Sequence, residues 1–226
     1  MPRQKRIMEK CKLNVQAIIF DLDGTIVDSK EAYLEAAKVA FSTLGRRKVS
    51  IRTAMEIPKR FELGLTLNDL IKGIDEENFR EVYLKAYYQA TRTETRPFSD
   101  IGAILQNLSE RAKLALTTRR NVSKNEIIDQ LEKFHLAKYF QAVVTAIDTA
   151  NPKPSPEALI QCSKRLDVEL RECAVVGDSV VDVRAGKNAG AQTVAVLSGI
   201  FSLKELERAN PDLILESVKK LPDFLE

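Results

Sequence analysis

Short apolar runs alternate with amphipathic segments through most of the chain. The apolar runs, rich in β-branched residues, predict buried strands, whereas apolar positions spaced three and four apart predict helices. We expect strands at residues 15–20, 114–117, 142–146, 173–176, 193–196 and 213–215. Helices are expected at 123–134, 156–166, 180–189, 203–209 and 218–225. This alternation predicts an α/β fold with a parallel sheet that helices cover on both faces.

A helical block interrupts the alternation directly after the first strand. Apolar residues recur at helical spacing over 29–44, where Gly45 suits the C-cap, and again over 67–74 and 79–87. Nothing from 50 to 91 predicts a strand, and 93–97 is expected to be a linker ended by Pro97. We therefore expect a basic N-terminal tail at 1–14, a core domain at 15–29 and 96–226, and an inserted helical domain at 30–95.

Composition narrows the class of protein. The chain has 226 residues, of which 44% are hydrophobic, enough to bury a sizeable core. Its net charge of +3 is too mild to argue for nucleic acid, and no apolar stretch is long enough to span a bilayer. Cys11, Cys162 and Cys173 are scattered and odd in number, which fits a reducing, cytoplasmic location without disulfides. The tail at 1–14 has five basic residues and no apolar core, so it is not a secretory signal.

Two carboxylates follow the first predicted strand. Asp21-Leu22-Asp23-Gly24-Thr25 comes directly after the apolar run 17–20. Ligands of open α/β sheets bind at the carboxyl ends of strands, so this position suits chemistry. Asp21 could attack an electrophile while Asp23 exchanges a proton with the leaving group, and Thr25 offers a hydroxyl to an oxyanion. The alternative is an Asp-Gly turn that ends a strand.

Three further groups of polar residues follow later strands. Thr118, then Arg119 and Arg120, comes after the strand at 114–117, and Thr117 is an alternative hydroxyl. Lys153 lies in a loop stiffened by prolines on both sides, over 151–156. Asp178 follows the apolar run 173–176, and Asp182 is four residues further on. Asp182 is alternatively a helix N-terminal acid that the macrodipole favours.

In their order and spacing these four groups resemble the motifs of the haloacid dehalogenase-like hydrolases. The resemblance covers residues 15 to 225 and implies a Rossmann-like core with an inserted C1-type helical cap. It also implies a Mg²⁺-dependent phosphatase that acts on a small phosphorylated metabolite through an aspartyl-phosphate. The implied catalytic residues are Asp21 as nucleophile, Asp23 as general acid and base, Thr118 and Lys153. The implied substrate-binding residues are Thr25, Thr118, Arg119 and Lys153. The implied metal-site residues are Asp21 and Asp178 as carboxylate ligands, Asp23 through its carbonyl, and Asp182 outside the direct ligands or linked to the metal through water.

Within this family, the chain most resembles the phosphoglycolate phosphatases and their pyrophosphatase-like relatives. Those relatives often have Asn-Lys where this chain has Arg119-Arg120, so the substrate stays open. Three alternatives stay open. A β-phosphoglucomutase-like enzyme would usually have Glu-Asp where this chain has Gly177-Asp178, and a dehalogenase would lack an acid at position 23, where this chain has Asp23. The third alternative is a non-catalytic protein that uses the fold for binding. We expect a monomer or homodimer that binds neither nucleic acid nor membrane. The basic residues of the helical domain form a hypothetical contact for an anionic leaving group: Arg46, Arg47, Lys48, Arg52, Lys59 and Arg60.

Overall fold

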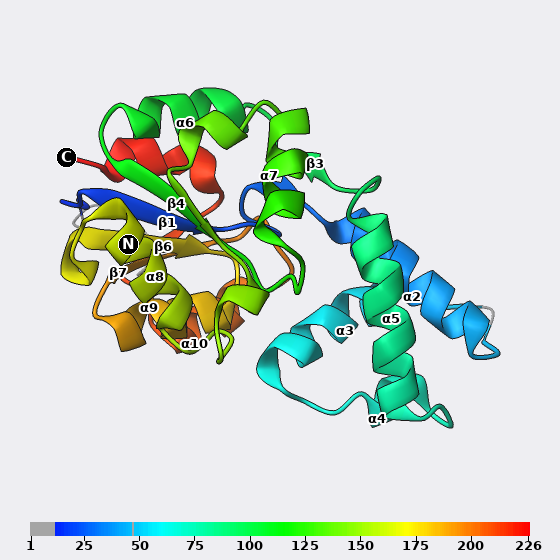
Figure 1. Cartoon of the computed structure of the whole chain (residues 1–226). Coiled ribbons are helices and arrows are strands. Elements are labelled where there is room, and N and C mark those ends of the chain that lie inside the picture. Colours follow the sequence, from blue (N-terminus) through cyan, green and yellow to red (C-terminus); the bar gives the residue numbers. More distant parts are fainter. Residues whose placement is uncertain (1–11, 47) are drawn as a thin grey trace. The chain divides into compact units, whose positions relative to one another are not determined.

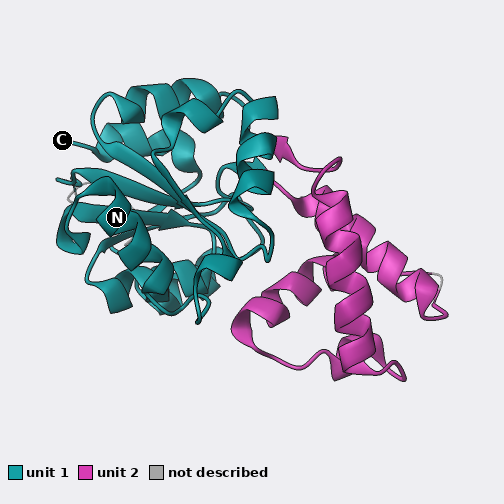
Figure 2. Cartoon of the chain, viewed as in Figure 1, with its two compact units in different colours: residues 1–27, 97–226 teal, residues 28–96 magenta. Residues whose placement is uncertain are grey.

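The computed structural model describes residues 12–46 and 48–226. The predicted basic tail therefore lies largely outside the described residues, as do Cys11 and Arg47. The chain divides into two compact units, one formed by its N-terminal part up to Val27 together with Pro97–Glu226, and the other by Asp28–Arg96 (Figure 2).

The larger unit is built on a six-stranded sheet in the order β5-β4-β1-β6-β7-β8 (Figure 1). Every pairing within this sheet is parallel. Its strands are β1 (Ala17–Asp21), β4 (Lys113–Thr117), β5 (Ala142–Val144), β6 (Cys173–Gly177), β7 (Gln192–Val196) and β8 (Leu213–Leu215). Its α-helices are α6 (Ile101–Ser109), α7 (Lys124–Lys133), α8 (Glu157–Leu166), α9 (Val180–Ala189) and α10 (Leu203–Ala209). The predicted parallel α/β sheet is confirmed.

Both faces of the sheet are buried, which explains why its strands are almost continuously apolar. Successive side chains of β1 point to opposite faces, so Ile18 and Phe20 join one core cluster while Ala17 and Ile19 join another. The first cluster includes residues of α6 and α7, and the second includes residues of α8 and α9. Because β1 is central, its carboxyl end lies between the ends of β4 and β6.

Several boundaries differ from the sequence prediction for local reasons. The predicted strand 142–146 ends at Val144, because Thr145 caps a short 3₁₀ helix, η2 (Ala146–Asp148). The predicted last helix is the 3₁₀ helix η4 (Val218–Phe224), which contains Pro222, a residue unable to donate the α-helical hydrogen bond. Two further 3₁₀ helices are η1 (Ala137–Tyr139) and η3 (Leu170–Glu172). Helix α6 was not predicted.

The segment predicted as a linker contains a strand. β3 (Arg96–Pro97) pairs with β2 (Val27–Asp28) in a two-stranded sheet. These two short strands are the places where the chain passes from one unit to the other. Strands of two residues have too few positions to show a period of two, so the hydrophobic pattern could not reveal them.

The smaller unit is helical. It consists of α2 (Lys30–Thr43), α3 (Ile51–Leu63), α4 (Asn68–Ile71) and α5 (Glu76–Ala90). Aromatic residues pack α2 against α5, with the Tyr33 and Tyr87 rings stacked at 5.4 Å and the Phe41 and Phe79 rings 5.0 Å apart. Buried aromatic pairs of this kind give the unit a core of its own.

Candidate active site

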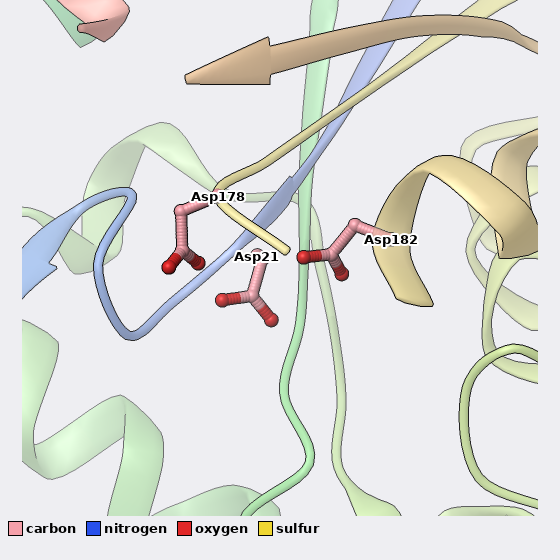
Figure 3. Close-up of side chains that lie close together, drawn as sticks. All are labelled: Asp21, Asp178 and Asp182. Atoms are coloured by element: carbon pink, nitrogen blue, oxygen red, sulfur yellow. The ribbon is translucent and has the colours of Figure 1, made fainter. Parts of the chain in front are cut away.

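Residues far apart in the sequence meet at the carboxyl ends of the central strands. Asp21 is the last residue of β1, Asp178 directly follows β6, and Asp182 lies in the first turn of α9. Figure 3 shows the three carboxylates gathered at this edge of the sheet. Each offers an oxygen, and these three oxygens lie within 4.8 Å of one another. The topology therefore brings together the acids that the motifs singled out.

Lys153 joins this acidic cluster as its counter-charge. Its Nζ donates to Asp21 Oδ1 at 2.6 Å and forms an ion pair with Asp182 Oδ1 at 2.8 Å. All four residues are largely withdrawn from water, with residue exposures of 9% for Asp21, 5% for Lys153, 6% for Asp178 and 2% for Asp182. Arg119 holds the lysine loop in place, because its Nη1 donates to the carbonyl of Lys153 at 2.9 Å.

The pKa values of Asp21 and Lys153 are both raised above their usual values. Burial is the main cause that holds the pKa of the Asp21 carboxyl well above its usual value; Lys153 opposes this shift, and Asp182 adds to it. Burial alone would lower the pKa of the Lys153 ammonium, but Asp182 and Asp21 outweigh it, so that pKa lies above its ordinary value. Lys153 is therefore a cation at neutral pH, and further positive charge near Asp21 would favour the ionised form of its carboxyl.

Asp178 lies against backbone that leaves no room for another side chain. A Cβ built on Gly24 would lie 2.6 Å from Asp178 Oδ2, and one on Gly199 would lie 1.6 Å from the same atom. The amide of Ile200 donates to Asp178 Oδ2 at 3.3 Å, and Ser198 Oγ donates to the carbonyl of Gly24 at 2.6 Å. The loop after β7 therefore helps to position Asp178. Sequence reasoning missed this loop, because its contacts are backbone contacts that carry no motif.

Asp182 is a helix N-terminal acid, one of the two interpretations that the sequence left open, while its place in a metal site stays a prediction. Its Oδ2 accepts from the backbone amide and the hydroxyl of Ser179, at 3.2 and 2.6 Å, and so forms a capping box at the start of α9. Its Oδ1 faces Lys153. A Cβ on Gly177 would lie 2.3 Å from Asp182 Oδ2, so this carboxylate also needs glycine beside it.

The side chain of Asp23 is engaged by an arginine that sequence reasoning did not assign. Arg120 donates from Nε to Asp23 Oδ2 at 2.8 Å and from Nη2 to Asp23 Oδ1 at 2.6 Å. The structure therefore places the Asp23 carboxylate in a two-pronged ion pair and outside the group of three carboxylates. Two successive arginines after a strand gave no sign of this, because a pairing 97 residues apart depends on the fold.

The predicted hydroxyl residues are buried but differ in their contacts. Thr118 Oγ1 accepts from the backbone amide of Arg120 at 3.1 Å, while the amide of Thr118 itself donates to Val144 at 3.1 Å. Thr117, the alternative, is within β4 and donates to the carbonyl of Phe20 at 3.4 Å. Thr25 Oγ1 has no hydrogen-bond partner among the described residues, and Thr25 lines a cavity of about 50 Å³.

Two of the basic residues predicted to meet an anionic leaving group are held within the helical unit. Arg60 pairs with Asp69 and Glu56 and donates to the carbonyl of Thr66 at 2.9 Å. Arg46 donates to the carbonyl of Leu70 at 3.3 Å. Of the other positions, Lys48 and Arg52 are exposed and Lys59 is half-buried. The substrate contact proposed for this group stays a prediction.

The acidic cluster fits a divalent cation. Three carboxylates against one ammonium leave a formal charge of −2 in a buried position when all are ionised. An uncompensated buried charge of this size is costly, and a cation of charge +2 would balance it. All three candidate ligands are oxygens, the donor type that Mg²⁺ prefers. Histidine or cysteine ligands, which would favour zinc, do not belong to the cluster.

Comparison with known proteins points to one family. A family model described as haloacid dehalogenase-like hydrolase matches residues 18–196. A phosphoglycolate phosphatase from Neisseria meningitidis is 30% identical, with 94% of both chains covered. The pyrophosphatase PpaX from Halalkalibacterium halodurans is 28% identical, over 95% of this chain and 97% of the relative. A haloacid dehalogenase-like family hydrolase from Streptococcus pneumoniae has a similar fold, with a TM-score of 0.77 at 21% identity, covering 93% of this chain and 98% of its own.

These matches confirm the family predicted from the four motifs and the prediction of a hydrolytic enzyme. Among the described residues, no helix combines the length and apolar character that crossing a bilayer requires.

Proposed function

Because the chain belongs to the haloacid dehalogenase-like hydrolase family, we propose that it is a Mg²⁺-dependent phosphatase that uses Asp21 as its nucleophile. The observation that carries this proposal is the buried cluster of Asp21, Asp178 and Asp182 around Lys153, with its formal charge of −2. Asp21, Asp178 and Asp182 would hold the cation, and the carbonyl of Asp23 is the remaining proposed ligand. Bound Mg²⁺ would supply positive charge that keeps Asp21 ionised and neutralises the phosphoryl group.

The reaction then divides into two displacements. In the first, an Asp21 oxygen bonds to phosphorus while the bond from phosphorus to the leaving oxygen breaks, and Asp23 gives that oxygen a proton. In the second, Asp23 takes a proton from water, whose oxygen attacks phosphorus and releases Asp21 with inorganic phosphate. Lys153 and the Thr118 hydroxyl bind the phosphoryl oxygens, where negative charge is spread. We assign Thr25 and Arg119 to the same phosphoryl site.

The test is phosphate release with and without Mg²⁺, for the wild type, Asp21→Asn and the surface control Asp100→Asn. We expect release that needs Mg²⁺, survives in Asp100→Asn and is lost in Asp21→Asn, since Asn cannot form the phosphoenzyme. Release that persists in Asp21→Asn would refute the nucleophile. Acid-quenched protein should carry one phosphoryl group on Asp21, detectable by mass spectrometry.

Two substrate classes follow from the relatives. A phosphomonoester with a small carboxylate, as in the Neisseria relative, and pyrophosphate, as in the Halalkalibacterium relative, are both small anions. We propose the phosphomonoester as the substrate and pyrophosphate as the second candidate. Relative kcat/KM for phosphoglycolate and pyrophosphate decides between them. Isomerisation of a sugar phosphate without net phosphate release would instead indicate a mutase.

We further propose that Asp28–Arg96 is a cap that selects the leaving group. Exchanging charge at the exposed Lys48 and Arg52 should change the ranking of substrates and leave Mg²⁺ dependence intact. A substrate ranking that does not move would contradict this role.

We propose a cytoplasmic enzyme that acts as a monomer or homodimer. Light scattering coupled to gel filtration decides between monomer and homodimer.

A further inference from the structure

Arg120 is a buried arginine that makes several specific hydrogen bonds. Its residue exposure is 4%, so its charge is almost fully withdrawn from water. Two of its nitrogens reach the two oxygens of Asp23, at 2.8 and 2.6 Å. This planar, two-pronged arrangement fixes the plane of the carboxylate as well as its position.

Other contacts hold Arg120 from both of its ends. Its Nη1 donates to Gln130 Oε1, on α7, at 2.7 Å. Its backbone amide donates to Thr118 Oγ1 at 3.1 Å, and its carbonyl accepts from the amide of Ala146 at 3.2 Å. The guanidinium is therefore held at its tip by α7, and the backbone of Arg120 is held by Thr118 of its own loop and by the first residue of η2. An arginine held in this way can transmit a fixed orientation to the group that it binds.

We propose that Arg120 is a positioning residue that orients the Asp23 carboxylate for proton exchange with the leaving group. The inference rests on the proposed function, in which Asp23 is the general acid and base. A carboxylate has about four lone-pair sites and the arginine fork uses two of them, so the fork by itself does not exclude a proton on either Asp23 oxygen. Arg120 thus acts through Asp23 and makes no contact of its own with the substrate.

The orientation matters because proton transfer needs close alignment with the leaving oxygen. A lysine at this position would keep the charge but replace the fork with a point charge on a flexible stem. We therefore expect Arg120→Lys to recover only part of what Arg120→Met loses. This graded loss separates orientation from charge alone.

The experiment compares two substrates of nearly the same shape, phenyl phosphate and 4-nitrophenyl phosphate. Phenol is the poorer leaving group and needs the general acid more. For Asp23→Asn and phenyl phosphate we expect a loss of roughly 10² to 10⁴ in kcat, the usual contribution of general acid catalysis. For Arg120→Met we expect a loss in the same direction, about tenfold or more on phenyl phosphate and clearly smaller on 4-nitrophenyl phosphate.

The double variant shows whether Arg120 acts through Asp23. In the Asp23→Asn background, Arg120→Met should cost no further activity, because residues that act as a unit are strongly non-additive. A further loss there would show that Arg120 acts on the substrate directly, and an equal loss on both phosphate esters would show a merely structural role. Either result overturns the inference. Arg165→Met, which removes hydrogen bonds to Val143 and Gln161, is the matched control and should leave the ratio of the two substrates unchanged.

Failure of the proposed function has a different signature. Activity that survives Asp21→Asn would overturn the role of Asp21 as nucleophile and with it the proposed function. If Asp21→Asn is inactive but Arg120→Met behaves like the control Arg165→Met, only the inference about Arg120 is overturned. Urea unfolding of the single and double variants tests the pair without activity. Midpoint changes that simply add would show that Arg120 and Asp23 do not interact, and the inference would then be wrong.

Discussion

Replacing Lys153 with methionine should weaken the metal-free protein and at the same time strengthen its response to Mg²⁺. The ammonium of Lys153 is 2.6 Å from Asp21 and 2.8 Å from Asp182, and its side chain is 3% exposed. Methionine keeps much of the volume but removes the charge. With all three carboxylates ionised, the formal charge of the cluster then changes from −2 to −3.

The size of the destabilisation follows from burial. Removing one partner of a buried ion pair costs about 3–5 kcal/mol, because the remaining charge is left without compensation. For a chain of 226 residues each kcal/mol lowers Tm by about 2–4 °C, so we expect a fall of roughly 6–20 °C without metal. The loss should shrink at low pH, since a proton on Asp21 removes one of the repelling charges.

The same change should increase stabilisation by Mg²⁺. A cation of charge +2 meets a more negative cluster in Lys153→Met, and each tenfold gain in affinity adds about 1.4 kcal/mol to its stabilisation at saturation. Activity should nevertheless fall, by about 10² to 10³ in kcat, because one group that stabilises charge in the transition state is missing. The variant would then be a tighter metal binder and a poorer enzyme.

Scanning calorimetry across a Mg²⁺ titration measures both effects. Lys219→Met is the matched control, since Lys219 pairs with Asp100 at 2.7 Å but its side chain is 43% exposed. Such exposed pairs contribute about 0–1 kcal/mol, so its Tm should barely move. Equal Tm values for Lys153→Met and Lys219→Met would refute the buried ion pair. A smaller Mg²⁺ shift in Lys153→Met than in wild type would refute the charge argument.

Three shorter predictions concern single groups. Because folding raises the pKa of Asp21, its contribution to the stability of the metal-free protein is full below about pH 4 and is lost as the pH rises through the folded pKa. Urea unfolding midpoints measured across pH should show this fall in stability, and saturating Mg²⁺ should make the fall smaller. Gly199→Ala should displace Asp178 and weaken Mg²⁺ binding, as measured by titration calorimetry. Gly102→Ala should not, because the added Cβ would lie 3.7 Å from its nearest neighbour, Leu136 Cδ2. Cys162, whose pKa burial raises to about 12, should react with a thiol reagent only after unfolding, as peptide mapping would show.

The sequence pattern predicted most of the larger unit. Its strands are buried on both faces, so their apolar runs stand out from the amphipathic helices between them. The carboxyl ends of parallel strands lie at one edge of the sheet, which is why Asp21 and Asp178 could be expected to meet although 157 positions separate them. Helix α6 was not predicted, although its buried residues Ile101, Leu105 and Leu108 recur at helical spacing.

What the pattern could not predict are contacts that depend on one particular packing. Gly199 gave no motif, yet no larger residue fits beside Asp178. The pairing of Arg120 with Asp23 needs β1 and β4 to be neighbours in register, with Asp21 opposite Thr117. The assigned roles of Asp23, Thr25 and Thr118 therefore stay predictions, even though the places of these residues are known.

The two arginines that depart from the common Asn-Lys form bear on where specificity lies. Arg119 donates to the carbonyl of Lys153, and Arg120 binds the carboxylate of Asp23. Both side chains are thus used to position groups of the proposed catalytic machinery. A difference from relatives at these positions need not mean a different substrate, because the same chemistry can be supported by other contacts. Arg119→Asn should therefore lower kcat for every substrate by a similar factor, and a changed ranking of substrates would show that Arg119 selects among them directly.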